Sequence, residues 1–304
     1  MIASVSLKDQ AGLTEALGRS FADYGFAIVR DHGIPQALIE EAEAEAKALF
    51  ALPEAAKRRY SIPGGGGARG YTPFGIETAK GAKAHDLKEF WHIGRELPPG
   101  HPFRAVMPDN VWPAEIPGFR ATMLALYDAF DAAGLKVLAA VARYLKVDEG
   151  YFADTVRDGN SVLRLLHYPP QPEPTGQHIR AGAHEDINTI TLLLGAEEAG
   201  LELLTSDGRW IPVSPKPGEL VINIGDMLQR LTNGQLRSTS HRVVNPAPDR
   251  AAHARYSMPF FLHFRPDYRI EALPGTVAEG VAPQWLPITA HEYLLERLRE
   301  IKLA

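Results

Sequence analysis

Apolar side chains recur at intervals of three and four positions in several long stretches of the chain. Residues 13–24, 36–52, 119–145 and 290–302 all follow this pattern, with polar and charged residues on the positions between. A spacing near 3.6 residues is typical of amphipathic helices. We therefore predict four helices, and we expect the longest, 119–145, to pack behind a sheet.

Other stretches are short runs of β-branched, aliphatic and aromatic residues. Residues 26–29 and 86–94 have this character, and residues 161–264 contain a series of such runs separated by turns rich in Pro, Gly, Asn and Asp. Closely spaced short strands are typical of a β-sandwich or barrel. We predict a mainly β fold with flanking helices and a double-stranded β-helix (jelly-roll) core.

The length and composition of the chain suit one domain. It has 304 residues, 45% of them hydrophobic and 23% charged, without an internal repeat or a linker that would separate two units. That apolar content is ample for a sizeable core. We predict a single domain over residues 1–304. In it, residues 1–118 form an N-terminal region of helices and strand, and residues 119–304 contain the longest helix, the jelly-roll and a C-terminal helix.

The charge and the cysteine count exclude several classes of function. A formal charge of −5 provides no basic surface for nucleic acid or an anionic membrane. The chain has no cysteine, which rules out disulfides and thiolate metal sites and suits a reducing compartment. No apolar run approaches 18 residues, and the first ten residues are too polar for a signal peptide. We expect a cytoplasmic protein, and nothing in the sequence indicates an obligate protein partner.

A histidine and an aspartate stand two positions apart at the start of a strand-like run. His184 and Asp186 precede residues 187–194, which are rich in β-branched and aliphatic types. On a strand, positions i and i+2 point to the same face, so the imidazole and the carboxylate can converge on one point. Glu185 then points the other way.

His241 supplies a third group of the same kind much further along the chain. Two histidines and one carboxylate on one face of a metal form the facial triad of non-haem Fe(II) oxygenases, which leaves coordination positions open. Without thiolates, structural zinc is disfavoured. The sequence therefore predicts an iron site made by His184, Asp186 and His241.

An arginine and a serine follow His241 in another strand-like run. Arg255 carries a planar guanidinium that suits bidentate binding of a carboxylate, and Ser257, at i+2, adds a hydroxyl donor on the same side. An arginine paired with an internal acid is the structural alternative. We favour a carboxylate pocket because the serine stands beside it.

With these residues in place, the sequence resembles the 2-oxoglutarate/Fe(II) oxygenases of the isopenicillin N synthase-like group. The five residues just described occur in the order and spacing that the group uses. Three further segments, 163–170, 221–226 and 240–244, also resemble those of the group, and the resemblance covers most of the chain.

The resemblance implies a specific chemistry. Fe(II) is bound by the three predicted ligands, 2-oxoglutarate chelates the iron, and Arg255 and Ser257 anchor its distal carboxylate. O₂ is then consumed as 2-oxoglutarate is decarboxylated and a small organic substrate is oxidised, with hydroxylation the favoured outcome. An oxidase of the same group that does not use 2-oxoglutarate is one alternative, and a cupin-like protein that only binds a metal or small molecule is another.

Two more residues are candidates for the co-substrate pocket. Tyr168 resembles the group's tyrosine that reaches the co-substrate, and a satisfied interior hydroxyl is the equally weighted alternative. Asn223 lies on a predicted strand two positions before Gly225. Leu166 stands where many relatives carry asparagine, which weakens the transfer of their pocket details to Tyr168.

The substrate cavity is predicted from side chains that are aromatic or carry an imidazole. The strand at 86–94 alternates so that Lys88, Phe90 and His92 share one face. The candidates are Tyr71, Phe74, Phe90, His92 and Phe261. Such a lining suits a small organic molecule rather than a protein or a nucleic acid.

Overall fold

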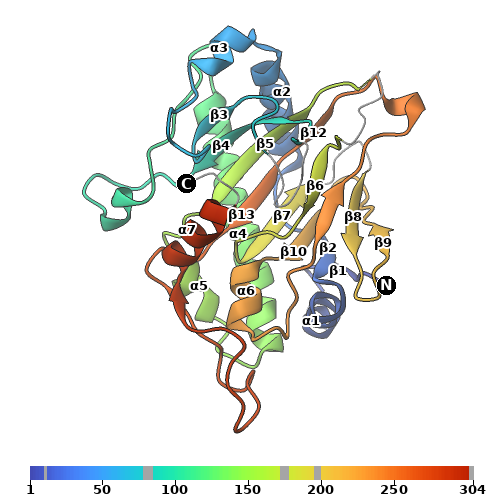
Figure 1. Cartoon of the computed structure of the whole chain (residues 1–304), viewed down its shortest axis with the longest axis vertical. Coiled ribbons are helices and arrows are strands. Elements are labelled where there is room, and N and C mark those ends of the chain that lie inside the picture. Colours follow the sequence, from blue (N-terminus) through green and yellow to red (C-terminus); the bar gives the residue numbers. More distant parts are fainter. Residues whose placement is uncertain (10–11, 78–84, 172–177, 195–199, 301–304) are drawn as a thin grey trace.

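Two mainly antiparallel sheets form the centre of the computed structural model, which describes residues 1–9, 12–77, 85–171, 178–194 and 200–300 (Figure 1). The larger sheet contains, in spatial order, β1 (Ser4–Ser6), β2 (Phe26–Arg30), β10 (Leu220–Ile224), β7 (Ile190–Leu194), β13 (Pro259–Leu262), β5 (Val162–Tyr168), β4 (Glu89–Gly94) and β3 (Gly70–Thr72), and β12 (Arg255–Ser257) also pairs with β5. The smaller sheet contains β6 (Ala181–His184), β11 (His241–Val243), β8 (Leu201–Leu204) and β9 (Trp210–Pro212). Only β1 and β2 pair in parallel among the described strands. This is a mainly β fold with a double-stranded β-helix core, as predicted.

Helices α1 (Leu13–Tyr24), α2 (Gln36–Ala51) and α4 (Phe119–Tyr144) form a layer on the outer face of the larger sheet. The other described helices are α3 (Glu54–Arg58), α5 (Tyr151–Val156), α6 (Asp226–Leu231) and α7 (Ala290–Glu300), with the 3₁₀ turns η1 (Pro102–Ala105) and η2 (Pro248–Arg250). A separate two-stranded ribbon joins β14 (Arg269–Ile270) to β15 (Ile288–Thr289). Helix α4 packs against β7 and β13, and α1 and α2 pack against α4. The prediction of a long helix behind the sheet is confirmed.

Aromatic stacking and one glycine bring α4 close to the sheet. The ring of Phe130 stacks on that of Phe260 in β13, with centroids 5.4 Å apart, and Tyr127 meets the same ring edge-on at 4.9 Å. Gly134 lies where the helix crosses the strands, and a Cβ there would overlap Cδ1 of Leu262. The close approach of α4 therefore depends on a residue without a side chain.

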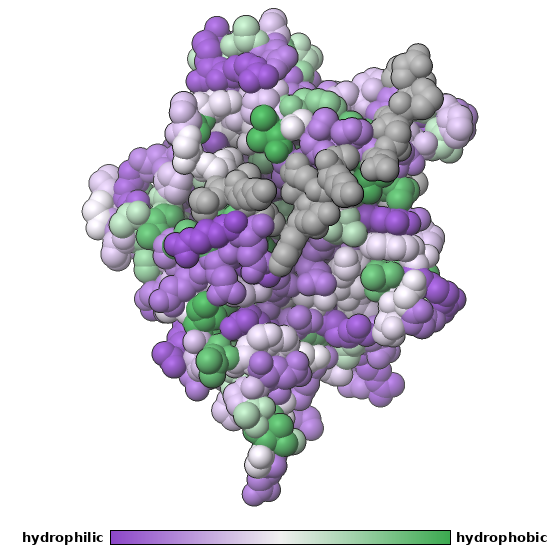
Figure 2. Space-filling view, in the orientation of Figure 1, coloured by the Kyte–Doolittle hydropathy of each residue, from purple (hydrophilic) through white to green (hydrophobic). Residues whose placement is uncertain are grey.

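The apolar residues form two layers. One cluster lies between the larger sheet and its helices and runs from Val5 to Tyr293, so it joins the N-terminal region to the C-terminal helix. This shared core supports the single-domain prediction, which stays a prediction. The second cluster, which includes Phe26, Phe90 and Val221, fills the space between the two sheets. In Figure 2, hydrophilic residues dominate the visible surface and its hydrophobic residues lie in small groups.

The strand alternation in β4 sorts its side chains between these two layers. Phe90 belongs to the cluster between the sheets, whereas Trp91 and Ile93 pack in the layer toward the helices. The predicted assignment of faces is therefore confirmed, although the strand begins at Glu89 rather than at residue 86. Among the described residues, no helix has both the length and the apolar character needed to cross a membrane.

Candidate metal and co-substrate site

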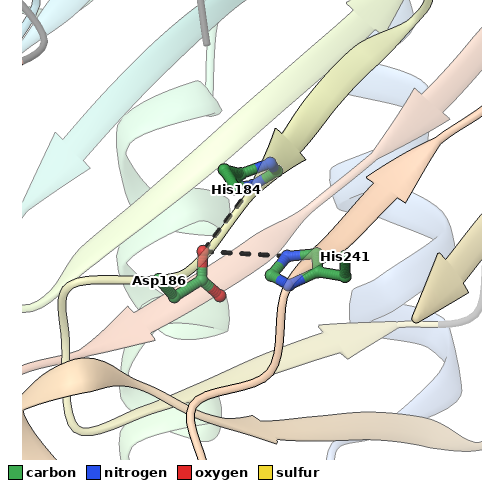
Figure 3. A group of neighbouring side chains, drawn as sticks. All are labelled: His184, Asp186 and His241. Atoms are coloured by element: carbon green, nitrogen blue, oxygen red, sulfur yellow. Dashed lines mark ion pairs between the residues drawn. The ribbon is translucent and has the colours of Figure 1, made fainter. Parts of the chain in front are cut away.

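Three side chains predicted as metal ligands meet between the two sheets (Figure 3). His184 and His241 are directly opposite one another in the antiparallel strands β6 and β11, so their side chains lie on the same face. The Oδ1 atom of Asp186 is 3.8 Å from the Nε2 atom of each imidazole. Each of these distances is less than twice a metal–ligand bond of about 2.1 Å, so one cation can bridge the carboxylate to either histidine.

Backbone carbonyls set the orientation of both imidazoles. Nδ1 of His184 lies 2.7 Å from the carbonyl oxygen of Gly182, and Nδ1 of His241 lies 3.1 Å from that of Thr239. A carbonyl oxygen only accepts hydrogen bonds, so each Nδ1 carries a proton and each Nε2 is the ring nitrogen that can bind a metal. Enclosure in the site, followed by the neighbouring His241, lowers the pKa of His184 to about 4. That imidazole is therefore neutral and able to bind a metal at neutral pH.

The carboxylate of Asp186 is held ionised by its surroundings. Burial by itself would raise its pKa, but His241, His184 and two hydrogen bonds outweigh that effect and lower the pKa below the ordinary value. Two imidazoles and one carboxylate suit Fe(II) and leave coordination positions open for further ligands. The residues present therefore fit the metal that the sequence predicted.

Asp186 does not lie on a strand, which corrects the expected geometry of the pair. Strand β6 ends at His184, and β7 begins only at Ile190. The carbonyl oxygen of Asp186 accepts a hydrogen bond from the backbone N–H of Asp226 at 2.7 Å, and Met227 donates to Asn188 at 3.1 Å. The first turn of α6 thus binds the carbonyls that a neighbouring strand would otherwise bind. His184 and Asp186 therefore converge because the first turn of α6 holds the segment between β6 and β7. They do not converge by alternation along one strand.

Two polar side chains fix the Asp186 carboxylate from behind. Oδ2 accepts hydrogen bonds from Oγ1 of Thr191 at 2.5 Å and from Nδ2 of Asn223 at 2.8 Å. Oδ1 is thereby left to face the two histidines. Asn223, predicted to contact the co-substrate, instead orients a metal ligand. Thr191 was not predicted to have a role. The only indication in the sequence is that it is the one polar residue in an otherwise aliphatic strand.

Removal of the Thr191 hydroxyl is expected to weaken metal binding. Outer hydrogen-bond partners of metal ligands contribute about 10- to 100-fold to affinity. We expect Thr191→Val to raise the dissociation constant for Fe(II) or Co(II) about 10-fold, measured by anaerobic titration. Thr232→Val is the matched control, because this buried hydroxyl donates only within α6 and its C-terminal turn. Equal affinities in Thr191→Val and the unaltered protein would contradict the assignment.

The predicted carboxylate clamp lies on the inner face of the larger sheet. Strand β12 pairs with the end of β5, which places Arg255 opposite Tyr168 and Ser257 opposite Leu166. Directly opposed residues share a face, and both β5 residues belong to the cluster between the sheets. Arg255 is 3% exposed, and its guanidinium carbon lies 5.1 Å from the centre of the Tyr168 ring. The ring therefore packs against the guanidinium and limits its orientation.

A cavity of about 500 Å³ opens beside the metal ligands. Phe90, His92 and Phe261, three of the five predicted substrate residues, are among the described residues that line it. Tyr71 and Phe74 are not, and these two predictions are corrected. Tyr71 is paired with Trp91 across β3 and β4, so it faces the helical layer, where its hydroxyl donates to Glu89. Phe74 follows β3 in a turn and is 43% exposed.

Comparison with known proteins gives two family matches. Residues 2–115 match the family described as non-haem dioxygenase in morphine synthesis N-terminal. Residues 159–264 match the 2OG-Fe(II) oxygenase superfamily. The second segment contains all three metal-ligand candidates together with Arg255 and Ser257.

Individual relatives are similar along nearly the whole chain. A 2-oxoglutarate-Fe(II) type oxidoreductase, hxnY of Emericella nidulans, is 34% identical over 93% of this chain and 83% of its own length. A 2OG-Fe(II) oxygenase family protein from Caulobacter crescentus is 57% identical, with a TM-score of 0.91 and 99% of each chain covered. A full-length protein from Neurospora crassa, solved in complex with alpha-KG, is 31% identical, with a TM-score of 0.88 and coverage of 98% of this chain and 96% of that chain. These relatives favour the dioxygenase over both alternatives.

Proposed function

This chain belongs to the 2OG-Fe(II) oxygenase superfamily, and from that membership we propose which of its residues carry out the reaction. The protein is a 2-oxoglutarate- and Fe(II)-dependent dioxygenase that oxidises a small organic substrate. His184, Asp186 and His241 hold the iron. The observation that carries this assignment is that the Nε2 atoms of both histidines lie 3.8 Å from one carboxylate oxygen of Asp186.

Arg255 and Ser257 bind the distal carboxylate of 2-oxoglutarate in this proposal. Both side chains are buried on the inner face of the larger sheet, and a planar guanidinium binds a carboxylate with two parallel hydrogen bonds. Tyr168 holds the Arg255 guanidinium against its ring. The clamp fixes the end of the co-substrate that is remote from the metal, so the keto acid end is directed toward the histidines.

The protein's own part in the reaction is to position groups and to exclude water. Bound iron and 2-oxoglutarate supply the oxidising power, because decarboxylation of the keto acid is coupled to reduction of O₂. Thr191 and Asn223 hold the Asp186 carboxylate in one orientation. The ring of Phe26 meets His241 edge-on at 5.5 Å and, with the apolar cluster between the sheets, keeps water from that side of the site.

Hydroxylation is the outcome that this proposal favours. One oxygen atom of O₂ enters the substrate as a hydroxyl group and the other enters succinate, while 2-oxoglutarate loses CO₂.

We also propose a cytoplasmic location, because a chain without cysteine needs no oxidising compartment for its stability.

The test is a stepwise titration of the purified protein. Anaerobic addition of Fe(II) and then 2-oxoglutarate should produce a weak visible charge-transfer band, and subsequent exposure to O₂ should release succinate. A bound iron that gives neither the band nor succinate would favour the oxidase that does not use 2-oxoglutarate. Failure to retain iron at all would contradict the oxygenase assignment.

A further inference from the structure

A second group of cationic side chains lies on the same inner sheet face as Arg255. Lys88 precedes β4 and lies on the side of Phe90 and His92, and Arg164 is directly opposite His92 in β5. These two cations, together with Phe90 and His92, line the cavity beside the metal ligands. None of them has a role in holding the iron or, in the proposal above, 2-oxoglutarate.

Arg164 is fixed on three sides. Its guanidinium carbon lies 4.4 Å from the ring centre of Phe90 and 5.2 Å from that of Phe261. Its Nε donates to Nε2 of His92 at 2.5 Å, while Nδ1 of His92 lies 2.6 Å from the carbonyl oxygen of Gly67. Only the tautomer with the proton on Nδ1 satisfies both contacts. Burial, followed by the charge of Arg164, lowers the pKa of His92, so it stays a neutral acceptor.

The terminal nitrogens of Arg164 have one contact with a described acid, a long hydrogen bond from Nη1 to Glu77. The one described acid near them is Glu77, whose Oε2 lies 3.5 Å from a terminal nitrogen of Arg164 but 2.8 Å from Nζ of Lys88. Lys88 also binds Asp86 at 2.8 Å. The charges of Glu77 and Asp86 therefore balance those of Lys88 and Arg164. The closest contact of each acid is with Lys88.

Arg69 adds a positive charge that no described acid balances by direct contact. It is 2% exposed and lines the same cavity, and its guanidinium lies so close to Gly94 that a Cβ there would overlap it. Its contacts are with the carbonyl oxygen of Ala68 and, at 3.4 Å, with Asn160, and its Nε has no hydrogen-bond partner. Burial lowers the pKa of Arg69 to about 10, so it remains a cation. A buried and unbalanced cation is costly unless an anion joins it.

Arg164 and Arg255 extend from different positions along the inner face of the larger sheet. Arg255 is opposite Tyr168, four residues beyond Arg164 along β5, so the two backbone positions are about 13 Å apart at the rise of a β-strand. Arg164 is among the described residues that line the cavity beside the metal ligands, and Arg255 is not. The inner face therefore offers two separate places for a carboxylate.

We propose that the primary substrate is a small organic acid whose carboxylate binds the terminal nitrogens of Arg164, with Arg69 supplying the balancing charge behind it. This inference rests on the function proposed above, because it takes the Arg255 position to be filled by 2-oxoglutarate. Aromatic packing and the His92 contact hold the guanidinium ready for a ligand, which reduces the cost of ordering it on binding. The remainder of the substrate then extends from this anchor toward His184 and Asp186.

The test compares acids with their uncharged amides on protein saturated with Fe(II) and 2-oxoglutarate. The probes are benzoate and benzamide, phenylacetate and phenylacetamide, and hexanoate and hexanamide. Under anaerobic conditions an acid should perturb the visible band, and in air it should stimulate succinate release, whereas its amide should do neither. Arg164→Gln should weaken binding of the acid about 50-fold, since charge-assisted hydrogen bonds are lost, and should leave the KM for 2-oxoglutarate unchanged.

Further variants separate the outcomes. Arg164→Lys should recover part of the acid affinity, Arg69→Gln should weaken it less than Arg164→Gln, and the exposed Arg157→Gln should have no effect. Stimulation by amides as strong as that by acids, by no probe at all, or by acids to an equal extent in Arg164→Gln would overturn the inference. Absence of the band and of succinate before any probe is added would instead contradict the function on which it rests.

Discussion

Asp186→Ala is expected to abolish both iron retention and 2-oxoglutarate turnover. This carboxylate is the only anionic member of the ligand set, and its Oδ1 faces both imidazoles. Loss of an outer hydrogen-bond partner costs about 10- to 100-fold in affinity, and loss of the ligand itself should exceed that. Iron content after gel filtration and succinate formation at saturating 2-oxoglutarate are the two measurements.

The control for this variant is Asp207→Ala. Asp207 lies in the exposed turn between β8 and β9, where it pairs with Arg209, far in sequence from every ligand. It should keep full iron content and turnover. Undiminished turnover in Asp186→Ala would mean that the three side chains are not the metal site, whatever their arrangement.

Arg255→Gln should raise the KM for 2-oxoglutarate by about 100-fold, the equivalent of roughly 3 kcal/mol for a charge-assisted, bidentate contact. The distal carboxylate is bound equally in the ground state and the transition state, so kcat at saturating co-substrate should change much less. The visible band should require correspondingly more 2-oxoglutarate to appear. Iron content should stay the same, because Arg255 does not bind the metal.

Two further variants make this result interpretable. Arg255→Lys keeps the charge but not the planar pair of donors, so its KM should lie between those of Arg255→Gln and the unaltered protein. Arg265→Gln removes a half-exposed arginine that pairs with Asp267 and should change nothing. An unchanged KM in a folded Arg255→Gln protein, checked by its thermal unfolding, would place the co-substrate carboxylate elsewhere.

Local periodicity was enough to predict most of the elements. The helix predicted at 13–24 is α1, and the one predicted at 119–145 is α4 to within a residue, because burial of one helical face repeats in the sequence itself. The faces of β4 were predicted for the same reason. The identities and order of the metal-ligand candidates were also available, since residue type and spacing limit which side chains can act together.

Register and turn geometry could not be obtained in this way. Tyr71 and Asn223 have side chains that suit a pocket. Pairing with Trp91 makes Tyr71 face the helical layer, and Asn223 donates a hydrogen bond to Asp186. The sequence shows Arg164 within a predicted strand. Its proposed role in binding an anion depends on Phe90, Phe261 and His92, which surround it only in the folded structure.

The sequence by itself therefore determined the fold class, the chemistry and the three side chains that can hold iron. The tertiary structure decided how they meet, since Asp186 reaches the histidines through a turn held by the first N–H groups of α6. It also decided which polar groups face the cavity and which support it. The physical reason is that periodicity records which face of an element is buried, whereas contacts between distant elements depend on pairing that no local pattern contains.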